Sequence, residues 1–104
     1  MKHYFRAQRA GIPFSEMQKY VSESGGDGME GAGGVCACDS VSALLRNTVM
    51  DAMNDIDEII VFEGRELCEI YDGYRVEPVR EIARFTVAQF KSQAEQIACE
   101  YERW

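Results

Sequence analysis

The sequence predicts an α+β domain with a compact mixed sheet, in the order β-α-β-α-β-β-β-α. Three observations support this prediction. The run IIVFEG at residues 59–64 is apolar at successive positions, as in a strand buried on both faces. Asp72-Gly73 lies between two strand-like segments, which is typical of a hairpin turn. Residues 87–101 repeat apolar side chains at helical spacing. The chain has 104 residues, so we expect one domain, residues 1–104.

The first two predicted elements are a strand and a helix. HYFRAQ at residues 3–8 is a short aromatic run that favours a strand. Gly11 ends it, and Pro13 suits the first turn of a helix because its missing N–H has no partner there. One face of that helix would carry Phe14, Met17, Tyr20 and Val21.

A glycine-rich loop follows at residues 23–34. It holds six glycines, and we predict that it is the most mobile part of the chain. It contains the pattern G-x-G-x-x-G at residues 26–31. A dinucleotide site needs that pattern between a strand and a helix, whereas here it follows a helix and precedes a strand. Asp27 and Glu30 would also repel phosphate, so the pattern does not indicate such a site.

A short strand, VCAC, and a second helix are predicted next. Asp39 or Ser40 can cap this helix by accepting a hydrogen bond from a free backbone N–H. Apolar residues then recur at helical spacing, at Val41, Leu44, Leu45, Val49, Ala52 and Met53. The acidic segment NDIDE at residues 54–58 would end the helix.

The cysteines raise the question of a metal or redox site. Cys36 and Cys38 project from the same face of a strand. Zinc needs four ligands, usually as two close pairs, and Cys68, Cys99 and His3 are scattered along the chain. A disulfide between Cys36 and Cys38 would strain an extended backbone. We therefore expect no metal, free thiols, and Cys36 and Cys38 as small apolar residues of a core.

The last part of the sequence predicts further strands and a closing helix. ELCEIY and YRVEPV flank the Asp72-Gly73 turn, and EIARFT at residues 81–86 is a further strand candidate. Thr86 and Gln89 have the spacing of a capping box, in which each side chain bonds the other residue's backbone N–H.

Charge limits the classes of partner. The chain has 11 Lys and Arg against 18 Asp and Glu, giving a net charge of −7. Direct binding to nucleic acid needs clustered cations, so we expect none. A protein target with a basic surface fits better. No apolar run approaches a membrane span, and no apolar segment of a signal peptide follows the basic start, so we expect no membrane contact and a cytoplasmic location.

Three stretches of the sequence together resemble proteins of the ADP-ribosyltransferase fold. HYFRAQ is similar to the first strand of that family, and GGVCACDSVSALL to its second strand and following helix. The stretch from IIVFEG to YDGYRVEPVREIARF is similar to its later strands. The family includes a small phage anti-CRISPR protein that modifies its target with NAD.

The resemblance implies NAD as cofactor and assigns roles to four residues. Arg6 corresponds to the residue that contacts the NAD ribose or phosphate, and Ser40 to a serine that helps hold that site. Asp72, followed by Glu69, is the nearest carboxylate to the catalytic position, where it would stabilise the positive charge that develops on the ribose. The family's E-x-E motif is absent from the expected place.

Two functional hypotheses follow. The first is a minimal ADP-ribosyltransferase-like protein that binds NAD, with or without catalysis, and serves as a phage-encoded anti-defence factor. The second is a small acidic inhibitor, anti-CRISPR-like, that occupies a basic nucleic-acid-handling protein complex without catalysis.

Overall fold

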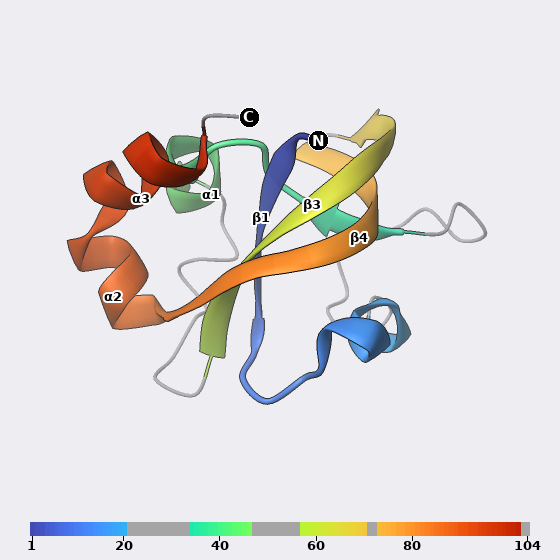
Figure 1. Ribbon diagram of the computed structural model, residues 1–104, viewed down its shortest axis with the longest axis horizontal. Helices are drawn as coiled ribbons and strands as arrows, with labels where there is room; N and C mark the ends of the chain where they lie inside the picture. The colour runs from blue at the N-terminus through green and yellow to red at the C-terminus, as the bar shows by residue number, and fades with distance from the viewer. Residues whose placement is uncertain (21–33, 47–56, 71–72, 103–104) are drawn as a thin grey trace.

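Two 14-residue strands dominate the computed structural model, which describes residues 1–20, 34–46, 57–70 and 73–102 (Figure 1). Its elements follow one another as β1 (His3–Arg9), the 3-10 helix η1 (Phe14–Tyr20), β2 (Val35–Ala37), α1 (Val41–Arg46), β3 (Asp57–Ile70), β4 (Gly73–Thr86), α2 (Val87–Ser92) and α3 (Ala94–Tyr101). The predicted α+β class is confirmed.

The sheet has the strand order β1-β3-β4-β2. All three pairings between these described strands are antiparallel, so the prediction of a mixed sheet is wrong. The reason lies in the connection between β3 and β4. Only residues 71 and 72 separate the two strands, and so short a connection permits antiparallel pairing alone. The predicted central strand is confirmed: β3 lies between β1 and β4, and residues 59–62 are fully buried.

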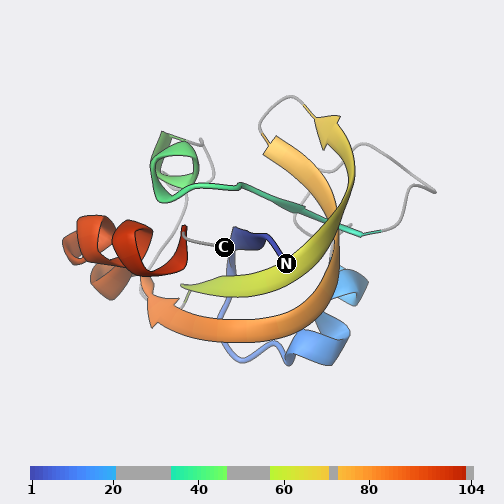
Figure 2. The ribbon, with the colours of Figure 1, turned by 45° about the horizontal axis from the view of Figure 1, so that its top comes forward.

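β3 and β4 are each continuous where the sequence predicts separate strands. The register between them shifts at three places, one of them between Glu63 and Gly64. A Cβ on Gly64 would lie 2.3 Å from the Val76 side chain, so only glycine allows this close approach. The bulges bend the hairpin without ending either strand, and Figure 2 shows the resulting curvature.

The curvature brings the two edge strands of the sheet together. Phe5 in β1 forms a bridge with Cys38, the residue that follows β2. The backbone N–H of Phe5 donates to the Cys38 carbonyl at 2.8 Å, and the N–H of Cys38 donates back to the Phe5 carbonyl at 2.9 Å. The four strands therefore form a nearly closed, barrel-like sheet.

Three helices cover one side of this sheet (Figure 1). They contribute half of a buried cluster made of Phe5, Cys38, Val41, Leu44, Ile59, Val61, Phe90 and Ile97. The capping box of Thr86 and Gln89 is confirmed at the start of α2. The single predicted last helix is interrupted at Gln93, which ends α2 and precedes α3.

A second buried cluster lies on the other face of β1 and β3. It includes Met17 of η1, which is fully buried, so the segment after Pro13 is helical as predicted but has 3-10 geometry. The other members are Tyr4, Val35, Ala37, Ile60, Phe62 and Val76. Phe14 and Tyr74 pack against it.

Some predicted features lie outside the described residues. The glycine-rich loop is one, except for Gly34. Asp72 and the part of the second helix beyond Arg46 are others. In the part of the chain that the structure describes, no helix is long and apolar enough to cross a membrane.

Candidate functional site

Arg6, the residue that the resemblance assigns to NAD, lies inside the fold. It projects from β1 and is only 5% exposed. Its Nη1 donates a hydrogen bond to the Cys36 carbonyl at 2.8 Å, which links β1 to β2 through a side chain. This contact gives Arg6 a structural role beside the bridge of Phe5 and Cys38.

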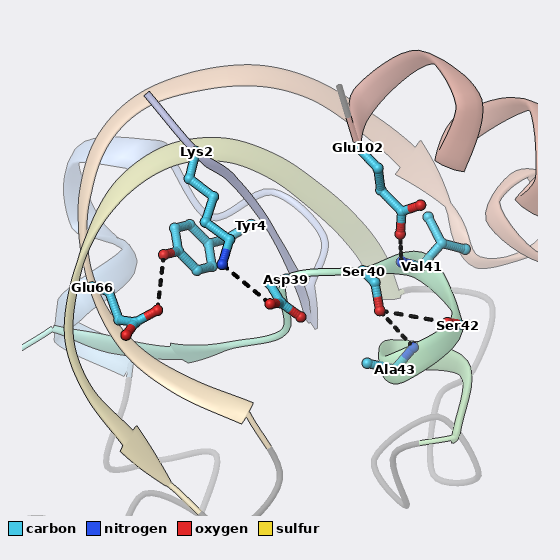
Figure 3. Close-up of polar contacts among 9 residues, drawn as sticks. All are labelled: Lys2, Tyr4, Asp39, Ser40, Val41, Ser42, Ala43, Glu66 and Glu102. Carbon is cyan, nitrogen blue, oxygen red and sulfur yellow. Dashed lines mark hydrogen bonds and ion pairs between the residues drawn. The ribbon is translucent and has the colours of Figure 1, made fainter. Parts of the chain in front are cut away.

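Ser40 caps helix α1. Its Oγ accepts a hydrogen bond from the Ala43 N–H at 3.1 Å, as the sequence predicts for Asp39 or Ser40 (Figure 3). Glu102, beyond α3, also accepts from the first turn, with its Oε1 2.7 Å from the Val41 nitrogen. The predicted cap is thus confirmed, and a carboxylate from the end of the chain supplements it.

Glu69, one of the two predicted catalytic carboxylates, is exposed near the end of β3. It pairs in register with Tyr74 of β4. Asp72, the other carboxylate, lies outside the described residues. Arg6, Ser40 and Glu69 contact different elements: Arg6 reaches β2, Ser40 caps α1, and Glu69 lies beside Tyr74.

A cluster that the sequence did not predict lies inside the curve of β3 and β4, and Figure 3 shows four of its members: Lys2, Tyr4, Asp39 and Glu66. We call Lys2, Tyr4, Tyr74, Asp39 and Glu66 the lysine cluster. The Lys2 Nζ lies 5.6 Å from the Tyr4 ring centroid and 5.3 Å from that of Tyr74. Both distances are within the range of a cation–π interaction. The same Nζ donates to Asp39 Oδ2 at 3.2 Å, and the Tyr4 hydroxyl donates to Glu66 Oε1 at 3.4 Å.

Negative charge dominates the lysine cluster. Burial, and then the Glu66 carboxylate, raise the pKa of Tyr4 to about 12. Asp39 is the main cause that raises the pKa of Tyr74, with smaller contributions from burial, Glu66 and Glu69, while Lys2 opposes the shift. Three carboxylates thus act on Tyr74 and one ammonium group offsets them. Asp39 and Glu66 outnumber the one ammonium group of the cluster, so the cluster carries a net negative charge.

Only one sequence signal pointed toward this cluster. Lys2 and Tyr4 are two residues apart, and alternate residues of a strand share a face. Asp39, Glu66 and Tyr74 come from three other segments, so only the topology of the curved sheet places them together.

The cysteine pair divides between two environments. Cys38 is 2% exposed in the helix-covered cluster, so its predicted core position is confirmed. Cys36 is half-buried, and Arg75 Nη1 lies 3.8 Å from its Sγ, so the prediction that it fills an apolar core is wrong. The two thiols therefore have different surroundings: the Cys38 side chain packs in the helix-covered cluster, and the Cys36 side chain lies beside the Arg75 guanidinium. The four cysteines form no disulfide with one another, and within the described ranges no three potential metal ligands come together.

Comparisons with known proteins complete the description of the site. No protein-family model, curated protein or solved structure matches the chain. The resemblance to the ADP-ribosyltransferase fold stays a hypothesis drawn from sequence patterns.

Proposed function

We propose that this chain is a small acidic protein that acts by binding a protein partner with a basic surface, without catalysis. The observation that carries the proposal is the gathering of Asp39 and Glu66 around Lys2 and Tyr4, with Glu69 paired in register with the neighbouring Tyr74. Tyr4 is buried and Tyr74 is partly exposed, and excess negative charge beside an accessible aromatic ring favours a cationic partner.

The distribution of positive charge supports the proposal. Arg6 and Arg75 are buried, at 5% and 4% exposure. Four further cations lie in ion pairs: Lys2 with Asp39, Arg65 with Glu77, Arg80 with Glu63, and Arg84 with Glu58 and Glu81. These pairs neutralise much of the positive charge at the described surface. Glu66, Glu69, Glu95 and Glu100 are exposed, so these four carboxylates are accessible to a partner.

A protein complex that handles nucleic acid is a suitable partner class. Such a complex must attract phosphates and therefore carries clustered Lys and Arg. An acidic chain of this size can occupy that surface and exclude the nucleic acid. Association driven by charge is fast at low ionic strength and weakens as salt screens it.

The test uses polylysine as the basic probe and calorimetry at two ionic strengths. We expect binding at low salt that weakens at high salt. The double variant Glu66→Gln/Glu69→Gln should bind more weakly than Glu95→Gln/Glu100→Gln, which removes the same charge from α3. Equal loss in both variants would show that net charge alone matters, and absence of binding at low salt would refute the proposal.

NAD binding is the competing prediction, and it rests on the sequence resemblance. Calorimetric titration with NAD, together with intact-mass analysis of candidate targets, tests it. If NAD binds, and Asp72→Asn keeps binding but abolishes transfer, the protein is a transferase and purely contact-based function is refuted. Asparagine keeps the shape of the Asp72 side chain, so NAD still binds. It lacks the charge that stabilises the transition state, so transfer is lost.

A further inference from the structure

The two tyrosines of the lysine cluster form two walls around an ammonium group. Their ring centroids are 6.2 Å apart and the ring planes meet at 67°. Lys2 Nζ lies at almost equal distance from both, at 5.6 Å and 5.3 Å. A cation placed between two such rings gains attraction from both π faces, which is how aromatic cages recognise ammonium ligands.

A hydrogen-bond acceptor completes this cage. Asp39 Oδ2 lies 3.2 Å from the Lys2 Nζ. An ammonium group that keeps its N–H bonds can donate to this carboxylate, whereas a trimethylated nitrogen has no donor. The cage therefore favours an unmodified lysine over its trimethylated form.

Lys2 can leave the cage without breaking the sheet. Its backbone carbonyl accepts a hydrogen bond from the Gly64 N–H of β3 at 3.3 Å, and the Lys2 side chain can move while this backbone contact is kept. Its side chain and that of Asp39 remain 31% and 30% exposed, so their ion pair is partly solvated and weak in water. Removal of Lys2 would leave three carboxylates, Asp39, Glu66 and Glu69, beside the rings with no cation between them.

We propose that Tyr4, Tyr74 and Asp39 form a binding site for the unmodified lysine side chain of a basic protein partner, and that Lys2 occupies this site until the partner's lysine replaces it. This inference rests on the proposed function and names the group that the partner supplies. Lys2 acts as an internal competitor, so the measured affinity for the partner is lower than the intrinsic affinity of the cage.

The experiment titrates a capped lysine peptide into the protein and follows the Tyr74 ring signals by NMR. Lys2→Ala removes the competitor, and we expect it to bind the peptide about two- to fivefold more tightly than the wild type, the range of a solvated cation–π contact. Lys2→Gln keeps much of the aliphatic side chain but removes the ammonium group, so it should also increase the affinity for the lysine peptide. Lys91→Ala, which removes an exposed cation from α2, is the matched control and should leave the affinity unchanged.

Two further binding measurements test which groups of the protein and of the peptide make the contact. In the Lys2→Ala background, Tyr74→Leu should lose most of the gained affinity, because it keeps apolar bulk but removes a π face. A trimethyllysine peptide should bind more weakly than the lysine peptide, because it cannot donate to Asp39. Asp39→Asn should therefore reduce the difference in affinity between the two peptides. Thermal melts followed by circular dichroism establish that each variant is folded.

The outcomes separate this inference from the proposed function. If Lys2→Ala and Lys2→Gln both bind the lysine peptide no better than Lys91→Ala, the cage is not the site. If polylysine still binds the wild type and responds to Glu66→Gln/Glu69→Gln, the proposed function stands while the cage is refuted. Absence of any polylysine binding refutes both.

Discussion

The carboxylate of Glu102 accepts a hydrogen bond from the backbone N–H of Val41 at 2.7 Å. The contact joins the residue after α3 to the first turn of α1, 61 positions earlier in the chain. A free N–H at a helix start needs an acceptor, and a negative charge there also interacts favourably with the helix dipole.

Glu102→Gln should therefore destabilise the protein. An amide keeps an acceptor oxygen but loses the charge, so we expect a decrease of about 0.3–1 kcal/mol in the free energy of unfolding. Urea denaturation measures it. Glu100→Gln, at an exposed position on α3, is the control. Equal effects of the two substitutions would show that the contact with Val41 contributes nothing.

Cys38→Ser should destabilise the fold more than Cys99→Ser. The Cys38 side chain is 2% exposed in an apolar cluster, whereas Cys99 is exposed. A hydroxyl buried without a full set of hydrogen bonds costs about 1–3 kcal/mol. Thermal melts of both variants measure the difference. An unchanged melting temperature for Cys38→Ser would contradict the core position of this thiol.

Gly34→Ala should cost more stability than Gly11→Ala. Both glycines have left-handed backbone, with φ of +74° and +88°, so both substitutions carry the same backbone penalty, about 1 kcal/mol. A Cβ on Gly34 would also lie 2.7 Å from the Val76 carbonyl oxygen, while around Gly11 no described atom lies within 4 Å. The steric difference should appear in urea denaturation. Equal losses would show that β4 shifts to accommodate the methyl group.

Tyr4 should make stability decrease in alkaline solution. Its pKa is raised from 10.0 to about 12 in the folded state, chiefly by burial and then by Glu66. The folded protein therefore holds this proton more tightly than the unfolded chain. The contribution is complete below pH 10 and is lost as the pH rises through about 12. Urea denaturation between pH 10 and pH 12 should show that Tyr4→Phe loses less free energy of unfolding than the wild type. If the free energy of unfolding falls equally with pH in both proteins, Tyr4 is not the group responsible.

The sequence predicted those features that depend on local signals. The capping box at Thr86, the cap at Ser40 and the buried strand through Ile59 each follow from a few adjacent residues. The continuous β3 was not predicted, because Gly64 is equally compatible with a strand end and with a bulge, and only its packing against Val76 decides between them.

The lysine cluster could not be predicted from local sequence signals either. Its acidic and aromatic members come from β1, β3, β4 and the segment after β2, and no motif joins them. Arg6 was selected by resemblance, and the structure gives it a contact with Cys36 inside the fold. Net charge, in contrast, follows from composition alone, and the expectation of a basic partner rests on it.

The bridge between Phe5 and Cys38 also bears on the order in which the chain folds. β3 and β4 are adjacent in sequence, so their hairpin closes a short loop and can form early. β1 must then find β3 across a large separation, from His3 to Glu63, before the sheet can curl onto β2. We expect this pairing to form after the rate-limiting step, so substitutions in β1 that weaken it should speed unfolding more than they slow folding.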